Sequence, residues 1–272
     1  MCLKKRFFTF IFTAHILLIG FACQRKQIDP AENPKGLVEE MVAAIGGIDK
    51  LHSLKDVEYT YTYQDLTTDQ KDVSIERYIF DGELSWAKFE TREKAVLPQI
   101  SGEIIQGYNG RESWMMIDGK LVEDDPQMAK LCDFLRKTNY YWFTMMFKLL
   151  DPGLNYEYNG TQNVDGTEYD LIKIAFGEGI GDAQDTYVLY INPETKLVDQ
   201  FLFTVMDFGA AEPRLMKVEY EEIQGVKLPT KRKYVKANWE GEPQDESWTA
   251  EISTNIKFNN GFDRSMFEKP TT

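Results

Sequence analysis

Residues 103–120 read EIIQGYNGRESWMMIDGK, and this stretch decides the fold of the chain. Two Asx-Gly pairs, Asn109-Gly110 and Asp118-Gly119, separate short runs of apolar and aromatic residues. Such pairs readily take the positive φ angles that a two-residue hairpin turn requires at its central positions. Strands joined by such a turn pair antiparallel. The stretch therefore predicts consecutive antiparallel hairpins.

The same pattern extends in both directions along the chain. Further turn signals occur at Asp81-Gly82, Asn159-Gly160, Asp165-Gly166 and Asn192-Pro193. Between the turns, Tyr, Phe, Trp, Val, Ile and Thr recur with a period of two, which is typical of strands with one more apolar face. The predicted strands lie at residues 57–65, 73–80, 84–92, 103–108, 112–117, 154–159, 168–176, 185–191, 197–206, 214–223, 228–239 and 247–258. We expect an up-and-down antiparallel meander within a single domain, residues 36–272.

Two segments show helical spacing instead. Apolar residues between 37 and 45 line one face of an amphipathic helix, which Gly46-Gly47 ends. A second helix is predicted to begin after the cap at Asp125-Pro126 and to end at Asp151-Pro152-Gly153, with a break near Thr138-Asn139. The fold class is therefore mainly β with a helical insertion, an α+β arrangement.

The chain opens with an export signal. Basic residues 4–6 precede an apolar run from Phe7 to Ala22 that is too short and wrongly flanked for a membrane span. Small residues precede Cys23, as in the lipobox of bacterial lipoproteins. We predict a lipoprotein signal peptide at residues 1–22, then a lipidated Cys23 that begins a flexible tether over residues 23–35. The alternative is an ordinary signal peptide that happens to contain a cysteine.

Charge and residue counts disfavour several function classes. The net charge of −13 becomes −16 without the signal peptide, which removes three basic residues and no acidic one, so nucleic acid is not an expected partner. After Cys23, His52 is the only histidine of the chain and Cys132 is the only cysteine. A zinc site with several histidines and an intramolecular disulfide are therefore excluded. The calcium-like run at residues 163–170 is interpreted as a turn. We expect no cofactor and no metal, although a carboxylate pair of the glycosidase type stays open.

The best candidate for binding is the segment YYWFTMMF at residues 140–147. A helix that is apolar almost all round must be covered on every side, and the concave side of a curved sheet would cover it. Tryptophan and methionine suit irregular apolar ligands. The alternative is that these side chains simply fill the core. The candidate ligand-binding residues are Trp114, Met116, Tyr140, Trp142, Phe143 and Met146.

Several further stretches carry a resemblance to a known family. They are LHSL at residues 51–54 after the Gly-Gly break, YINPETKL at 190–197, YEEIQGVKLP at 220–229, and the closing Asn259-Asn260 and Phe267. Together they resemble a family of Gram-negative envelope lipoproteins known as a domain of unknown function. This family is similar in layout to the LolA/LolB-like outer-membrane lipoprotein-sorting superfamily. The resemblance implies an unclosed antiparallel barrel with helices on its concave side, a cavity for acyl chains and no catalytic residues.

The leading hypothesis is a non-enzymatic, lipid-anchored envelope protein that binds a lipid, a lipidated peptide or another apolar ligand in a half-barrel cavity. An interaction or sensing module of the periplasm with a filled core is the alternative, and a carboxylate-based glycan hydrolase is a third. Gln24 follows Cys23 where an aspartate would favour inner-membrane retention. We therefore expect attachment to the outer membrane through the N-terminal lipid, with the domain facing the periplasm.

Overall fold

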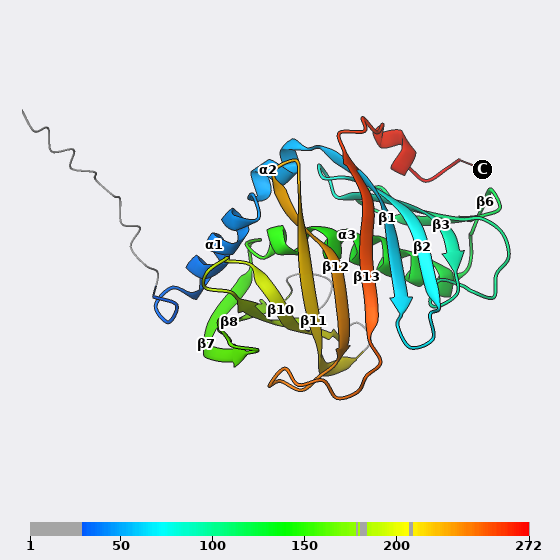
Figure 1. Cartoon of the computed structure of the whole chain (residues 1–272). Helices are drawn as coiled ribbons and strands as arrows, with labels where there is room; N and C mark the ends of the chain where they lie inside the picture. The colour runs from blue at the N-terminus through cyan, green and yellow to red at the C-terminus, as the bar shows by residue number, and fades with distance from the viewer. Residues whose placement is uncertain (1–28, 178, 180–183, 207–208, 272) are drawn as a thin grey trace, which may run out of the picture.

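The computed structural model describes residues 29–177, 179, 184–206 and 209–271 (Figure 1). The predicted signal peptide and Cys23 lie outside the described residues, so both stay predictions. The helices are α1 (Pro34–Ala44), α2 (Ile48–Ser53), α3 (Pro126–Lys148) and a 3-10 helix, η2 (Arg264–Phe267). The hydrophobic clusters of the fold draw on residues 37–267, so a chain that starts at Gln24 keeps all of them.

Thirteen described strands form one antiparallel sheet, in the order β6-β5-β4-β3-β2-β1-β13-β12-β11-β10-β9-β8-β7. The strands are β1 (Asp56–Asp65), β2 (Lys71–Ile79), β3 (Leu84–Arg92), β4 (Ile104–Tyr108), β5 (Ser113–Ile117), β6 (Lys120–Leu121), β7 (Leu154–Val164), β8 (Thr167–Phe176), β9 (Thr186–Ile191), β10 (Val198–Val205), β11 (Ala210–Ile223), β12 (Val226–Lys236) and β13 (Thr249–Phe258). The predicted up-and-down meander is confirmed within each half of the chain, because β1–β6 and β7–β13 are each a meander.

The two meanders are joined by pairing between β1 and β13, which stand almost at opposite ends of the described chain. This arrangement leaves β6 and β7 as the two edges of the sheet, so the sheet is not closed into a barrel. Helix α3 is the segment that leads from β6 to β7. It crosses the sheet from one edge to the other, and the sheet curves around it (Figure 1). The predicted fold class, an unclosed curved sheet with a helix on its concave side, is confirmed.

Three local predictions are wrong. Asn109-Gly110 does not form a two-residue turn, because Tyr108 pairs with Ser113 across a four-residue loop and Asn109 does not take a positive φ. Asn159-Gly160 does not end a strand, because β7 continues through it with a shift in register between Tyr158 and Thr161, and Gly160 takes a φ of 81° there. Helix α3 runs unbroken through Thr138-Asn139. The Asn139 amide donates a hydrogen bond to Glu76 on the sheet (3.2 Å), so a tertiary contact occupies a side chain that would otherwise favour a turn. The two-residue β6 was not predicted.

The start of α3 follows its sequence signals. Asp125 caps the helix by accepting hydrogen bonds from the backbone N–H groups of Gln127 and Met128, both at 3.0 Å, and Pro126 occupies the first turn. The first half of α3 packs on β3, β4 and β5. Its second half carries the apolar segment 140–147 into the main hydrophobic core. The helix is therefore held against the concave face of the sheet along its whole length.

Candidate binding cleft

A cleft of about 1400 Å³ lies between α3 and the concave face of the sheet. It runs along the helix and reaches the ends of the strands on both halves of the sheet. Aromatic side chains form much of its wall: Tyr61, Tyr63, Phe89, Tyr141, Trp142, Phe176, Tyr187, Phe203 and Tyr234. Leu154 and Val205 add aliphatic surface. The cleft therefore presents a broad apolar surface with tyrosine hydroxyl groups set into it.

Trp142 is fixed on the sheet side of the helix by contacts with three residues. Its indole ring stacks on Phe201, with ring centroids 6.1 Å apart, and meets the edge of Phe203 at 5.2 Å. The Nη1 of Arg232 donates a hydrogen bond to the backbone carbonyl of Trp142 (2.6 Å), and the guanidinium lies 5.7 Å from the indole centroid. These contacts attach α3 to β10 and β12, and hold the wall of the cleft in place.

The six residues proposed from the sequence divide into three groups. Tyr140 and Trp142 line the cleft. Phe143 and Met146 lie beneath the helix in the core, where Phe143 stacks on Tyr59 with centroids 4.7 Å apart. Whether any of these side chains contacts a ligand stays a prediction. Trp142 is only partly buried at the cleft, whereas Tyr140, at 4% exposed, is as deeply buried as Phe143 and Met146.

Trp114 and Met116 lie on the other face of the sheet. The Trp114 indole Nε1 donates a hydrogen bond to the backbone carbonyl of Phe267 (2.8 Å), beneath the C-terminal segment. A Cβ atom at Gly107 would lie 2.3 Å from the Trp114 ring, so this ring packs directly on the β4 backbone. Met115, between them, packs with Cys132 of α3 instead. The structure therefore does not bring Trp114 and Met116 to the cleft.

A buried ion pair, which the sequence did not reveal, anchors the first half of α3. Arg136 and Glu76 have no exposed side-chain surface, and Nη1 of Arg136 lies 2.7 Å from Oε2 of Glu76. Glu76 also accepts hydrogen bonds from Ser74 (2.7 Å) and Tyr78 (3.0 Å). Burial is the largest single effect and lowers the pKa of Arg136. The charge of Glu76 and its hydrogen bond to the guanidinium, with smaller contributions from Tyr78 and Cys132, together raise the pKa above its ordinary value.

A second buried ion pair lies in the cleft wall beneath the other half of the helix. Nη2 of Arg232 lies 2.9 Å from Oε2 of Glu251, and both side chains are 5% exposed. Burial raises the pKa of Glu251, and the Arg232 charge opposes this rise. The hydroxyl oxygens of Tyr63 and Tyr234 lie 2.5 Å apart in the same wall. The cleft thus has a polar end as well as an apolar surface.

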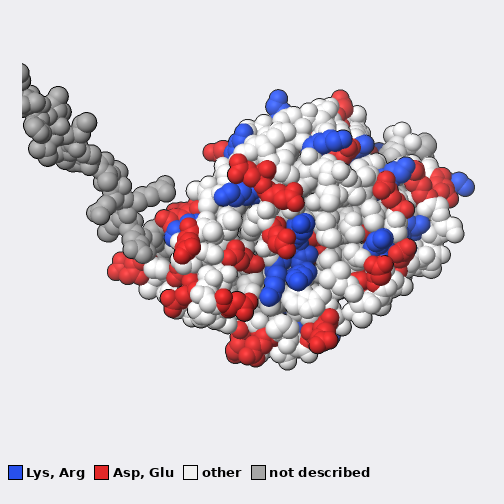
Figure 2. Space-filling view, viewed as in Figure 1, with Lys and Arg blue, Asp and Glu red and all other residues white. Residues whose placement is uncertain are grey.

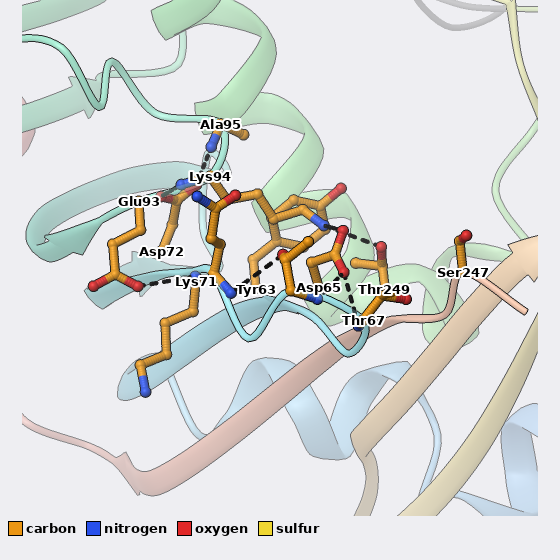
Figure 3. Close-up of polar contacts among 12 residues, drawn as sticks. Tyr63, Asp65, Thr67, Lys71, Asp72, Glu93, Lys94, Ala95, Ser247 and Thr249 are labelled. Carbon is orange, nitrogen blue, oxygen red and sulfur yellow. Dashed lines mark hydrogen bonds and ion pairs between the residues drawn. The ribbon is translucent and has the colours of Figure 1, made fainter.

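Lys94 connects three elements at the rim of this polar end. Its Nζ donates a hydrogen bond to Oγ1 of Thr249 (3.1 Å), lies 3.6 Å from Oδ2 of Asp65, and sits 4.7 Å from the centroid of the Tyr63 ring. Figure 3 shows these side chains converging from β1, β13 and the segment after β3. The contact fixes the ring of Tyr63 at the edge of the cleft.

The segment after β3 forms a wall of the cleft because one carboxylate holds its backbone. Asp72 is buried and accepts hydrogen bonds from the backbone N–H groups of residues 94–96, at 3.0, 2.8 and 3.1 Å (Figure 3). Ala95 and Val96 line the cleft as a result. The wall is thus held by backbone hydrogen bonds rather than by side-chain packing alone.

The reactive side chains named from the sequence lie away from the cleft. The His52 ring stacks on Phe80, with centroids 6.2 Å apart. Cys132 is 1% exposed, and burial raises the pKa of its thiol to about 12. Among the described residues, no group of three or more His, Cys, Asp or Glu side chains is arranged to hold a metal ion. Within the same part of the chain, no helix has the length and hydropathy needed to cross a membrane.

Comparison with known proteins places the fold. Residues 116–227 match the model of a family of unknown function, DUF6503. The structure is similar to that of a DUF1329 family protein from Desulfovibrio piger, with a TM-score of 0.53 and 14% identity over 89% of this chain and 98% of that one. It is also similar to a putative outer membrane lipoprotein-sorting protein domain from Vibrio parahaemolyticus, with a TM-score of 0.50 and 10% identity over 87% and 97%. No curated protein sequence matches. The predicted resemblance to the lipoprotein-sorting superfamily is confirmed for the fold.

Proposed function

We propose that the protein binds the apolar part of a lipid or of a lipidated peptide in the cleft beside α3. The observation that carries the proposal is the cleft itself, about 1400 Å³, with many aromatic side chains in a wall that also carries charged groups. Small-molecule sites usually occupy about 300–1,000 Å³, so this space is sufficient for a chain of lipid size. Burial of apolar surface contributes about 25 cal/mol per Å², which makes a long acyl chain a favourable occupant.

The proposal includes attachment to the cell envelope through a lipid on Cys23, with the domain facing the periplasm from the outer membrane. The first described helix begins at Pro34, eleven residues after Cys23. A fully extended chain spans at most about 3.6 Å per residue, so this tether would keep the domain within about 40 Å of the bilayer. The lipidated domain would therefore work close to a supply of acyl chains.

The test uses the chain from Gln24 onward, purified without added lipid. We expect lipid to copurify and to be identified by native mass spectrometry, and we expect a neutral fluorescent apolar probe to bind the emptied protein. Trp142→Ala removes a large part of the cleft wall, and should weaken probe binding about tenfold or more. Trp239→Ala is the matched control, because Trp239 is 46% exposed and does not line the cleft.

Circular dichroism of each variant shows whether the fold is retained. The proposal is refuted if the wild-type protein is empty and binds no apolar probe, which would favour a protein-binding role for the domain. It is also refuted if folded Trp142→Ala and Trp239→Ala variants bind the probe equally well.

A further inference from the structure

Arg214, at the polar end of the cleft, and Lys236 beside it on the neighbouring strand have no counterion among the described residues. Arg214 lines the cleft, and its cross-strand partner on β12 is Lys236. Like charges directly opposite each other on neighbouring strands destabilise a sheet. Neither side chain makes an ion pair or a hydrogen bond with any described residue, although the chain carries a net charge of −13. Opposed like charges also occur at Lys217 and Lys233 on the same two strands, but of these four residues only Arg214 lines the cleft.

The acidic groups of the cleft nearest this end are already engaged. Glu251 forms the buried ion pair with Arg232. Asp185 accepts hydrogen bonds from the Thr204 hydroxyl (3.1 Å) and from the backbone N–H of Met206 (2.8 Å). The charge on Arg214 is therefore left available to a ligand.

Hydroxyl groups add hydrogen-bond donors next to Arg214. Tyr63 and Tyr234 share one hydrogen bond, 2.5 Å between their oxygens, so whichever hydroxyl donates, the other retains an O–H group. Burial raises the pKa of both tyrosines, the Glu251 carboxylate adds to this rise, and the positive charge of Arg214 opposes it more weakly. This influence on both rings is consistent with a guanidinium close to the two hydroxyl groups. A guanidinium and a phenol O–H together suit the planar or tetrahedral oxygens of an anion.

We propose that Arg214, with the hydroxyl groups of Tyr63 and Tyr234, binds the anionic headgroup of an amphipathic ligand whose apolar chain lies in the cleft. This inference rests on the function proposed above and narrows its ligand to lipids with a carboxylate or a phosphate at the polar end. Lys236 contributes positive charge at the rim. The arrangement explains why the aromatic cleft ends in an arginine rather than in further apolar side chains.

The experiment compares ligands that share a chain and differ in charge. Oleate and oleyl alcohol, and dioleoyl phosphatidate and dioleoylglycerol, displace a neutral fluorescent probe from the chain that starts at Gln24, all below their aggregation concentrations. Wild-type protein is expected to prefer the anionic member of a pair by about ten- to a hundredfold, as for one charge-assisted contact. The pair with the larger preference identifies carboxylate or phosphate as the headgroup.

Arg214→Gln should abolish this preference while leaving the affinity for the uncharged lipid unchanged. Lys217→Gln is the matched control, because Lys217 lies on the same strand, three residues away, with its side chain on the opposite face of the sheet. Its cross-strand partner on β12 is Lys233, so it too stands opposite a positive charge. Figure 2, which shows the outer face, displays a group of basic side chains over β11 and β12 among acidic ones. Lys217→Gln should retain the wild-type preference, although it removes the same charge.

The outcomes separate this inference from the function on which it rests. Equal affinity for charged and uncharged lipids in the wild-type protein, or an unchanged preference in Arg214→Gln, overturns the headgroup assignment and leaves chain binding intact. A preference that Lys217→Gln loses as fully as Arg214→Gln also overturns it, because the effect would then be one of net charge. Failure of every lipid to displace the probe overturns both proposals.

Discussion

The buried pair of Arg136 and Glu76 should account for a large share of the stability of α3 on the sheet. Glu76→Gln keeps the shape of the side chain and removes its charge. Arg136 has no exposed surface, so its charge would remain buried without a counterion. The Glu76 carboxylate also accepts hydrogen bonds from Ser74, Tyr78 and Asn139, and an amide cannot accept from all of these donors.

Removing one partner of a buried ion pair costs about 3–5 kcal/mol of unfolding free energy. For a domain of 150–250 residues, each kcal/mol lowers Tm by about 2–4 °C, so we expect a decrease of about 6–20 °C. Urea denaturation followed by circular dichroism, together with a thermal scan, measures both quantities. Tryptophan fluorescence in the same titration reports whether α3 and the sheet unfold together.

Two further variants make the reasoning refutable. Glu58→Gln is the control, since Glu58 lies 2.7 Å from Nε of Arg77 but is 26% exposed, and exposed pairs contribute less than about 1 kcal/mol. In the Glu76→Gln background, Arg136→Met should recover stability, because no charge is then left buried. If Glu76→Gln costs no more than Glu58→Gln, the pair does not anchor the helix and the account of the cleft wall is mistaken.

Three other predictions concern buried groups. Cys132 is the single cysteine of a chain that starts at Gln24, and burial raises its thiol pKa to about 12. Its alkylation by iodoacetamide at pH 8 should therefore run below about 1% of the rate in urea. Equal rates would contradict its burial. Phe267→Ala should cost about 3–5 kcal/mol and shift Trp114 emission to longer wavelength, whereas an unchanged spectrum would contradict their contact. Asp56→Asn removes a carboxylate that accepts backbone hydrogen bonds from residues 260–262, so limited proteolysis should release residues 259–271 faster than in wild type.

The parts of the fold that were predictable depend on local signals. The turn at Asn109-Gly110 and the alternation along each strand are properties of a few neighbouring residues, so twelve of the strands follow from them. The pairing of β1 with β13 has no local signal, since it joins residues almost two hundred positions apart. The sequence therefore predicts the hairpins, while the joining of the two meanders depends on tertiary contacts.

The candidate site was only partly predictable for the same reason. The run Trp114 to Ile117 is apolar on both faces, so its alternation does not indicate which residues face α3. The opposition of Arg214 and Lys236 depends on a register shift between Glu219 and Tyr220, which counting back from the hairpin turn cannot anticipate. Segment 140–147 was identifiable because its composition alone requires that it be covered.

The central claim is that an acyl chain lies between α3 and the concave face of the sheet. The most direct measurement is photolabelling of the chain from Gln24 with an oleate analogue carrying a diazirine in its tail, followed by peptide mapping by mass spectrometry. Our account predicts labels on Tyr141, Trp142 and residues 203–205, all of which line the cleft. Labels concentrated on Trp114 or Trp239, or none above the level of the urea-unfolded protein, would contradict it.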